Sequence, residues 1–173
     1  MYIRRTAEAT LLEMANAFKV LAVTGPRQSG KTTLVRHVFS DKPYASLEDP
    51  DTREFALRDP RRFLLGYAGG AVFDEVQRCP EILSYLQGMV DGSQESGRFV
   101  LTGSQHFGLM EKISQSLASR VGVLHLLRFS LRELTDGGAA FDSPDALLFA
   151  GGYPSVHDGR VSPERWCNAY VDT

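Results

Sequence analysis

Residues 20–39, VLAVTGPRQSGKTTLVRHVF, decide the fold because they join an apolar run to a helical pattern through a turn bounded by glycines. Residues 20–23 are all apolar, which is typical of a strand buried on both faces. Residues 34–39 place apolar side chains at helical spacing. Between them, residues 25–32 match the pattern G-x-x-x-x-G-K-[ST]. The stretch therefore predicts a strand, a phosphate-binding loop and a helix, in that order.

Each type of residue in this loop has a chemical reason. The glycines let the backbone curl so that successive N–H groups point inward, at the positive end of a helix. Lys31 is expected to reach the β- and γ-phosphates of a nucleotide, and the hydroxyl of Thr32 to ligate Mg²⁺. The alternative is a glycine-rich turn that binds no ligand. The predicted nucleotide-binding residues are Gly25, Pro26, Arg27, Gln28, Ser29, Gly30, Lys31, Thr32 and Thr33.

A second apolar strand ends in two carboxylates. Residues 71–73 lead directly into Asp74 and Glu75. Asp74 is expected to hold Mg²⁺ together with Thr32, and Glu75 to polarise the attacking water as a general base. A solvated strand end is the alternative. The adjacent glutamate indicates an enzyme that hydrolyses a nucleoside triphosphate, rather than a kinase that passes the phosphate to an acceptor.

Two further positions complete the predicted catalytic set. The strand in FVLTGSQ, residues 99–105, ends in polar residues, of which Ser104 is the first candidate for contacting the γ-phosphate, with Thr102 and Gln105 behind it. These residues could instead form a turn that caps the next helix. Arg120 precedes the last apolar run and could stabilise the transition state within the chain or in a neighbouring subunit. A surface ion pair is the alternative role. The candidate catalytic residues are thus Lys31, Glu75, Ser104 and Arg120.

Short apolar runs alternate with helical patterns along the chain. Beyond residues 20–23, strands are predicted at residues 44–47, 71–73, 99–102 and 121–127. This alternation predicts an α/β fold with a doubly wound, mainly parallel five-stranded sheet flanked by helices. A connector rich in glycine and aspartate follows, and the pattern after it is helical. We therefore predict a core at residues 1–132 and a helical extension at residues 133–173, the truncated start of a second domain.

The composition is that of a globular protein and limits the classes of partner. The 173 residues carry a net charge of −2, so no overall basic field indicates nucleic acid, although such contact stays open. No apolar run is long enough to span a bilayer, so no membrane partner is expected. The two cysteines, Cys79 and Cys167, follow no secretory segment, which predicts a cytoplasmic protein with reduced thiols. The guanine-specific sequence Asn-Lys-x-Asp is absent, which favours ATP.

With these residues placed, the sequence resembles a prokaryotic AAA-type ATPase family whose members join an N-terminal AAA domain to a C-terminal domain. The shared strings are MYIRR, VTGPRQSGKTTL, FDEVQRCPEIL, LTGSQ, LASRVGVLHLLRFSLREL and GGYP. The sequence departs from the family at Arg128, where proline or an apolar residue is expected. The resemblance implies a P-loop core with ATP and Mg²⁺, a sensor-like residue and an arginine, at Lys31, Thr32, Asp74, Glu75, Ser104 and Arg120.

The predicted function is hydrolysis of ATP with Mg²⁺ to drive or time a conformational change, in a homo-oligomer or on the absent C-terminal domain. Two alternatives stay open. One is an interaction module that senses ATP with little hydrolysis, and the other is a P-loop kinase.

Overall fold

The structure is a computed structural model that describes residues 2–104, 107–159 and 161–171. The strands are β1 (Val20–Gly25), β2 (Tyr44–Ser46), β3 (Ala71–Asp74), β4 (Phe99–Ser104) and β5 (Val121–His125). The helices are α1 (Ala7–Ala17), α2 (Lys31–Val38), α3 (Pro50–Arg58), α4 (Pro60–Leu65), the short 3₁₀ helix Val76–Arg78, α5 (Ile82–Asp91), α6 (Phe107–Leu117), α7 (Leu131–Asp136), α8 (Pro144–Ala150), α9 (Pro154–His157) and α10 (Pro163–Val171). All five predicted strands are confirmed, and their ends differ from the prediction by one or two residues.

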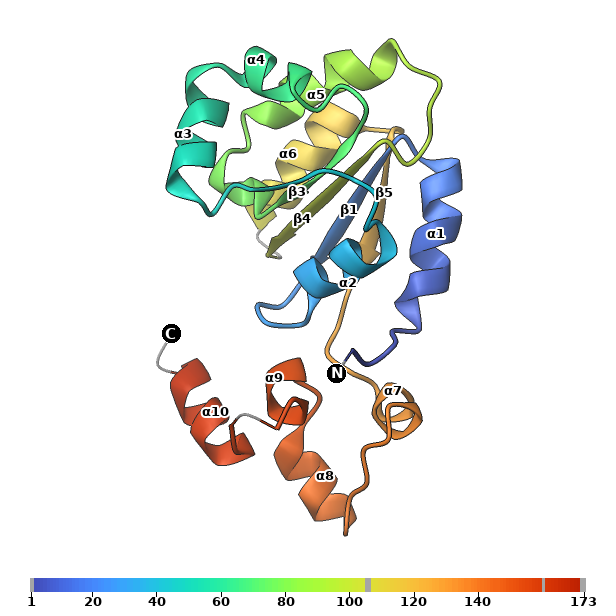
Figure 1. The fold of residues 1–173 in the computed structure, drawn as a ribbon, viewed down its shortest axis with the longest axis vertical. Coiled ribbons are helices and arrows are strands. Elements are labelled where there is room, and N and C mark those ends of the chain that lie inside the picture. Colours follow the sequence, from blue (N-terminus) through green and yellow to red (C-terminus); the bar gives the residue numbers. More distant parts are fainter. Residues whose placement is uncertain (1, 105–106, 160, 172–173) are drawn as a thin grey trace.

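The five strands form one sheet in the order β2-β3-β4-β1-β5 (Figure 1). Every neighbouring pair is parallel, which confirms the predicted parallel α/β sheet. β4 lies between β1 and β3, so the polar tip of β4 is placed between the glycine loop and the acidic tip. In register, Gly25 pairs with Ser104 and Ser46 pairs with Asp74. The carboxyl ends of four strands therefore bring their polar side chains to one edge of the sheet.

Helices cover both faces of the sheet because successive side chains of a strand point to opposite sides. Leu21 and Val23 of β1 pack in the cluster that includes α1 and α2, whereas Val20 and Ala22 pack in the cluster that includes α3 to α6. All four side chains are buried. Burying a side chain of the size of valine or leucine contributes about 1.5–3 kcal/mol. These two layers hold β1, and with it the start of the loop, in place.

The helices after β5 lie at the carboxyl ends of the strands, on the side where the loop between β1 and α2 emerges (Figure 1). α7 begins with a capping box in which the Oγ of Ser130 accepts from the backbone N–H of Glu133, and Glu133 accepts from the backbone N–H of Ser130. The segment that follows is helical, with α8, α9 and α10. The predicted division after residue 132 falls inside α7, and the assignment of a second domain stays a prediction.

Cys79 is buried, Cys167 is exposed, and both are free. None of the described helices has both the length and the apolarity that crossing a bilayer requires.

Candidate active site

The loop between β1 and α2 has the backbone geometry of an anion-binding turn. Gly25 adopts a φ of 150°, and a Cβ at this position would lie 2.1 Å from the carbonyl oxygen of Leu126. Gly30 has a φ of 90° and is the N-cap of α2. Gln28 also has a positive φ, of 58°. Backbone that alternates in this way turns successive N–H groups toward one concave side, next to the positive end of a helix.

Lys31 begins α2, and its side chain folds back over the loop. Its Nζ donates to the carbonyl oxygens of Gly25, at 3.2 Å, and Pro26, at 2.7 Å. Burial lowers the pKa of the ammonium group, and the charges of Glu75 and Asp74 partly offset that effect. Among the described residues, the hydrogen bonds of this ammonium group thus go to two neutral carbonyl groups.

The carboxylate of Asp74, at the tip of β3, is the acceptor at the centre of a set of hydroxyl groups. Thr32 Oγ1 lies 3.0 and 3.1 Å from its two oxygens, and Tyr44 OH donates to Oδ2 at 2.7 Å. Thr102 Oγ1 also donates to Oδ1. Burial, followed by the hydrogen bond to Asp74, raises the pKa of Tyr44 to about 12. Three elements, α2, β2 and β4, therefore orient this one carboxylate.

Tyr44 is a residue of the site that the sequence did not indicate. It is the first residue of β2, and its side chain crosses from that strand to the end of β3. The sequence shows only a tyrosine at the start of a short strand candidate. Its role depends on the pairing of β2 with β3, which no local pattern specifies.

Glu75 follows β3 in the left-handed backbone conformation, with φ 57° and ψ 46°. Its backbone N–H donates to Thr102 Oγ1 at 3.2 Å, so Thr102 contacts both acidic residues. Its carboxylate accepts from Nε2 of Gln77. A left-handed conformation is costly for a residue with a Cβ, and here Thr102 and Gln77 hold it.

Part of this set, namely Gly30, Lys31, Thr32, Glu75 and Gln77, lines one cavity of about 780 Å³. Ser104 is buried and lines it, as predicted for the tip of β4. Gln105 lies outside the described residues. The cavity is lined by the loop and α2, by the segment after β3, by two single residues, and by α9 and α10. The lining residues are Arg27, Gln28, Gly30, Lys31, Thr32, Thr33, Glu48, Glu75, Gln77, Arg78, Ser104, Pro154, Ser155 and Tyr170.

The contribution from the C-terminal helices is a second feature that sequence reasoning missed. Tyr170 of α10 lines the cavity together with Pro154 and Ser155 of α9. Trp166 of α10 donates from Nε1 to Oε1 of Gln28 in the loop, at 3.0 Å. The string GGYP marks this region in the sequence, but nothing local to it indicates a contact with the loop.

Arg120 lies at the opposite end of the sheet from this cavity. Its carbonyl oxygen accepts from the N–H of Val20, the first residue of β1, and its guanidinium pairs with Asp91. The loop leaves β1 five residues further on, roughly 16 Å away at the usual strand rise. In this structure Arg120 therefore lies far from the cavity of its own chain, and action on that site stays an untested prediction. Action on a neighbouring subunit stays a prediction.

Comparisons with known proteins agree with this architecture. The sequence model described as "AAA domain" matches residues 17–135, well over half of the chain. An uncharacterised protein of Mycobacterium tuberculosis is 32% identical over 98% of this chain, and the chain spans only 38% of that relative's length.

Two solved structures share the fold. The AMPPCP-bound DnaA of Aquifex aeolicus has a TM-score of 0.57 at 12% identity, covering 89% of this chain and 57% of that one. The Walker-type ATPase of Pyrococcus abyssi has a TM-score of 0.55 at 18% identity, covering 88% of this chain and 65% of that one. The family match rests on sequence, and the structural likeness supports the same fold. The chain therefore belongs to the AAA domain family and carries an AAA-type P-loop ATPase domain.

Proposed function

We propose that this chain binds ATP with Mg²⁺ and hydrolyses it, and that hydrolysis drives or times a conformational change. The observation that carries the proposal is the contact of the Thr32 hydroxyl with the Asp74 carboxylate at 3.0 Å. The two residues come from motifs 42 positions apart, and they meet beside the cavity that Lys31 and Glu75 also line. A hydroxyl, a carboxylate, an ammonium group and a candidate base thus converge on one place.

The residues present suit Mg²⁺ bound together with phosphates. Mg²⁺ is commonly held by one or two protein oxygen ligands, with substrate phosphates and water filling the other positions. Thr32 and Asp74 would hold it here. Among the described residues there is no group of three or more histidine, cysteine or acidic side chains that could form an all-protein metal site. When bound, Mg²⁺ would offset the negative charge of the phosphates. The side chains of Lys31, Glu75 and Ser104 would form the other contacts of the site.

Lys31 and Glu75 would have the two remaining chemical roles. The Lys31 ammonium rests on neutral carbonyl groups, and a bound phosphate would offer it a stronger, charged acceptor. Glu75 lines the cavity and would accept a proton from the attacking water. Ser104, buried at the tip of β4, would donate its hydroxyl to the γ-phosphate. General-base assistance contributes about 10²–10⁴-fold to a rate.

The test is Glu75→Gln, measured by phosphate release and by ATP binding. We expect turnover to fall by about 10²-fold or more, while ATP affinity stays near that of the wild type. Glu48→Gln is the matched control, because Glu48 is a second glutamate that lines the same cavity and is exposed at its rim. Unchanged phosphate release in Glu75→Gln would remove the proposed base, and loss of ATP binding would show a different role for Glu75.

A second candidate function is supported by two contacts. Gln77 binds the Glu75 carboxylate, and Gln28 of the loop binds Trp166 of α10. The candidate base is hydrogen-bonded to Gln77, and the phosphate loop is hydrogen-bonded to a C-terminal helix. Such a site suits a module that binds and senses ATP but hydrolyses little of it. Measuring phosphate release by this chain and by a form as long as its relatives separates the two functions. If only the longer form releases phosphate, the result supports ATP sensing with little hydrolysis by the present chain.

The partner of this domain and its location in the cell are also proposals. Because the chain spans 38% of the length of its mycobacterial relative, the segment that uses the conformational change is proposed to lie in a further C-terminal domain or in a second copy of the chain. A cytoplasmic location is proposed from the two free cysteines.

A further inference from the structure

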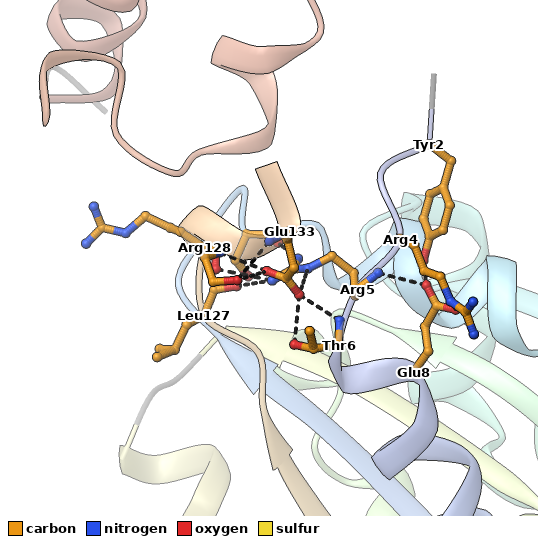
Figure 2. A network of polar contacts seen from close by, with 10 residues as sticks. Tyr2, Arg4, Arg5, Thr6, Glu8, Leu127, Arg128 and Glu133 are labelled. Atoms are coloured by element: carbon orange, nitrogen blue, oxygen red, sulfur yellow. Dashed lines mark hydrogen bonds and ion pairs between the residues drawn. The ribbon is translucent and has the colours of Figure 1, made fainter. Parts of the chain in front are cut away.

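Arg5 is a buried arginine that the proposed reaction does not use, and it lies directly against the phosphate loop. Its side chain is 5% exposed. Nη1 donates to the carbonyl oxygen of Ser29 at 3.0 Å, Nη2 donates to the carbonyl oxygen of Leu127 at 2.7 Å, and Nε donates to Oε1 of Glu133 at 3.1 Å. The guanidinium also lies 4.6 Å from the centre of the Phe129 ring. Figure 2 shows Arg5 reaching from the N-terminal segment toward Glu133 and the backbone after β5.

The carbonyl group that Arg5 holds belongs to the peptide between Ser29 and Gly30. All described peptide bonds are trans, so the C=O and N–H of that peptide point in opposite directions. Anchoring the Ser29 oxygen on Arg5 therefore fixes the direction of the Gly30 N–H. Gly30 lines the 780 Å³ cavity, whereas Arg5 lines a separate cavity of about 360 Å³ that Gly30 also borders. This peptide is thus part of the wall between the two cavities.

The backbone hydrogen bonds next to this peptide belong to the flanking groups: the N–H of Ser29 donates to Pro26 at 3.4 Å, and the carbonyl oxygen of Gly30 accepts from Leu34 at 2.9 Å. The Ser29 side chain is completely buried, and in the described part of the protein its hydroxyl has no hydrogen-bond partner. The backbone on both sides of it, at Gln28 and Gly30, has positive φ. Among the described residues, neither the Ser29 side chain nor a helical hydrogen bond fixes the plane of the peptide between Ser29 and Gly30, and the bond from Arg5 is its tertiary anchor.

We infer that Arg5 is a positioning residue of the phosphate loop, which orients the Gly30 N–H toward the phosphates of the bound nucleotide. The inference rests on the proposed function, because it names a determinant of phosphate binding at the same site. It also explains why a charge is buried here. A buried ion pair contributes little net stability compared with apolar residues of the same size, so stability alone does not account for Arg5 and Glu133.

Glu133 connects this anchor to the C-terminal part of the chain. Its carboxylate accepts from Arg5, from the N–H of Thr6 at 2.8 Å and from the N–H of Ser130 at 2.8 Å. Glu133 lies in α7, the first helix after the sheet. A displacement of α7 would therefore move the group that holds the loop peptide. Arg5 provides a direct physical connection between the start of the C-terminal segment and the phosphate site.

The experiment compares Arg5→Lys with Arg4→Lys. Arg4 is the adjacent arginine, its side chain is 86% exposed, and it forms an ion pair with Glu8, whose side chain is 12% exposed. Lysine keeps the charge but lacks the planar guanidinium that donates to four acceptors at once, the carbonyl oxygens of Ser29, Leu127 and Arg128 and the carboxylate of Glu133. Calorimetry would measure the affinity of each folded protein for ATP and for inorganic tripolyphosphate. We expect Arg5→Lys to weaken both by about tenfold or more, and Arg4→Lys to leave both unchanged.

A third variant, Glu133→Gln, separates positioning from folding. It removes the ionic partner and should lower stability, but it leaves the bond from Arg5 to Ser29, so we expect tripolyphosphate affinity to change less than about threefold. The ¹⁵N–¹H signal of Gly30 should move in Arg5→Lys and stay close to its wild-type position in Arg4→Lys. Loss of affinity in proportion to lost stability across Arg5→Lys and Glu133→Gln would overturn the inference, as would full affinity in folded Arg5→Lys.

The two proposals fail in different ways. If the wild type binds tripolyphosphate and ATP but releases no phosphate, the hydrolytic function fails and the role of Arg5 is still decided by the affinities. If the wild type binds neither ligand, both proposals are overturned.

Discussion

The indole N–H of Trp166, in α10, donates to the side-chain oxygen of Gln28, in the phosphate loop, at 3.0 Å. The two residues are 138 positions apart, so the contact joins the loop to the last described helix. The indole also packs against the rings of Tyr153 and Tyr170, whose centroids lie 4.2 and 4.8 Å from it and 5.0 Å from each other. Because Tyr170 lines the same cavity as Gln28, the environment of the indole depends on what occupies that cavity.

Trp166 should therefore report nucleotide binding. It is the only tryptophan in the chain, so the intrinsic emission above that of tyrosine comes from this residue alone. We expect ATP or ADP to change the intensity or the wavelength of that emission, and Lys31→Ala to abolish the response. Trp166→Phe verifies the source of the signal. Binding of ATP by calorimetry without any change in emission would show that the loop and α10 are not coupled.

Tyr44 should influence the requirement for Mg²⁺. Tyr44→Phe removes one of the three hydroxyl groups that orient the Asp74 carboxylate. Groups that orient a metal ligand typically change metal affinity by about 10–100-fold when they are lost. We expect the Mg²⁺ concentration for half-maximal turnover to rise by about tenfold. Tyr85→Phe, on the exposed side of α5, is the control. An unchanged Mg²⁺ requirement in Tyr44→Phe would contradict this role.

Arg120 should act, if it is catalytic, on the site of a neighbouring subunit. Arg120→Ala should then lose turnover and keep ATP binding, and mixing it with Glu75→Gln should restore part of the turnover, because each variant supplies what the other lacks. Asp91→Asn removes the same ion pair but keeps the arginine, so it should retain turnover. Equal losses in Arg120→Ala and Asp91→Asn, or no recovery on mixing, would indicate a structural ion pair.

Glu133 should make stability depend on pH on the acid side. Burial alone would raise the pKa of Glu133, but hydrogen bonds from the backbone of Ser130 and Thr6, and the charge and hydrogen bond of Arg5, outweigh burial and lower it. A carboxyl group with a lowered folded-state pKa stabilises the protein above its unfolded-state pKa of about 4.3, and this contribution is lost as the pH falls through the folded-state value.

Urea unfolding at neutral pH and near pH 3, roughly one unit below that unfolded-state pKa, measures the contribution. Breaking a buried pair costs about 3–5 kcal/mol, so Glu133→Gln should be less stable by that amount at neutral pH and closer to the wild type in acid. Asp136→Asn is the control on the same helix, because Asp136 forms a surface pair with Arg132. It should change stability by about 0.5 kcal/mol or less. A constant difference between Glu133→Gln and the wild type at both pH values would refute the assignment.

The sequence by itself determined the strands, the parallel sheet and the loop. The apolar run before Gly25, the glycines and Lys31 are local patterns, and alternation of strands with helices leaves few ways to form a sheet. It also placed Asp74 and Ser104 at strand tips, which lie at one edge because all the strands are parallel.

The tertiary structure alone decided which distant residues reach that edge. Tyr44 contacts Asp74 through the pairing of β2 with β3, Trp166 contacts Gln28 through the return of α10, and Arg5 holds Ser29 across 24 residues of sequence. The placement of Arg120 at the far end of the sheet likewise follows from the direction of β5. Spacing and composition report interactions between neighbours in sequence, whereas these contacts depend on how packed elements meet in space.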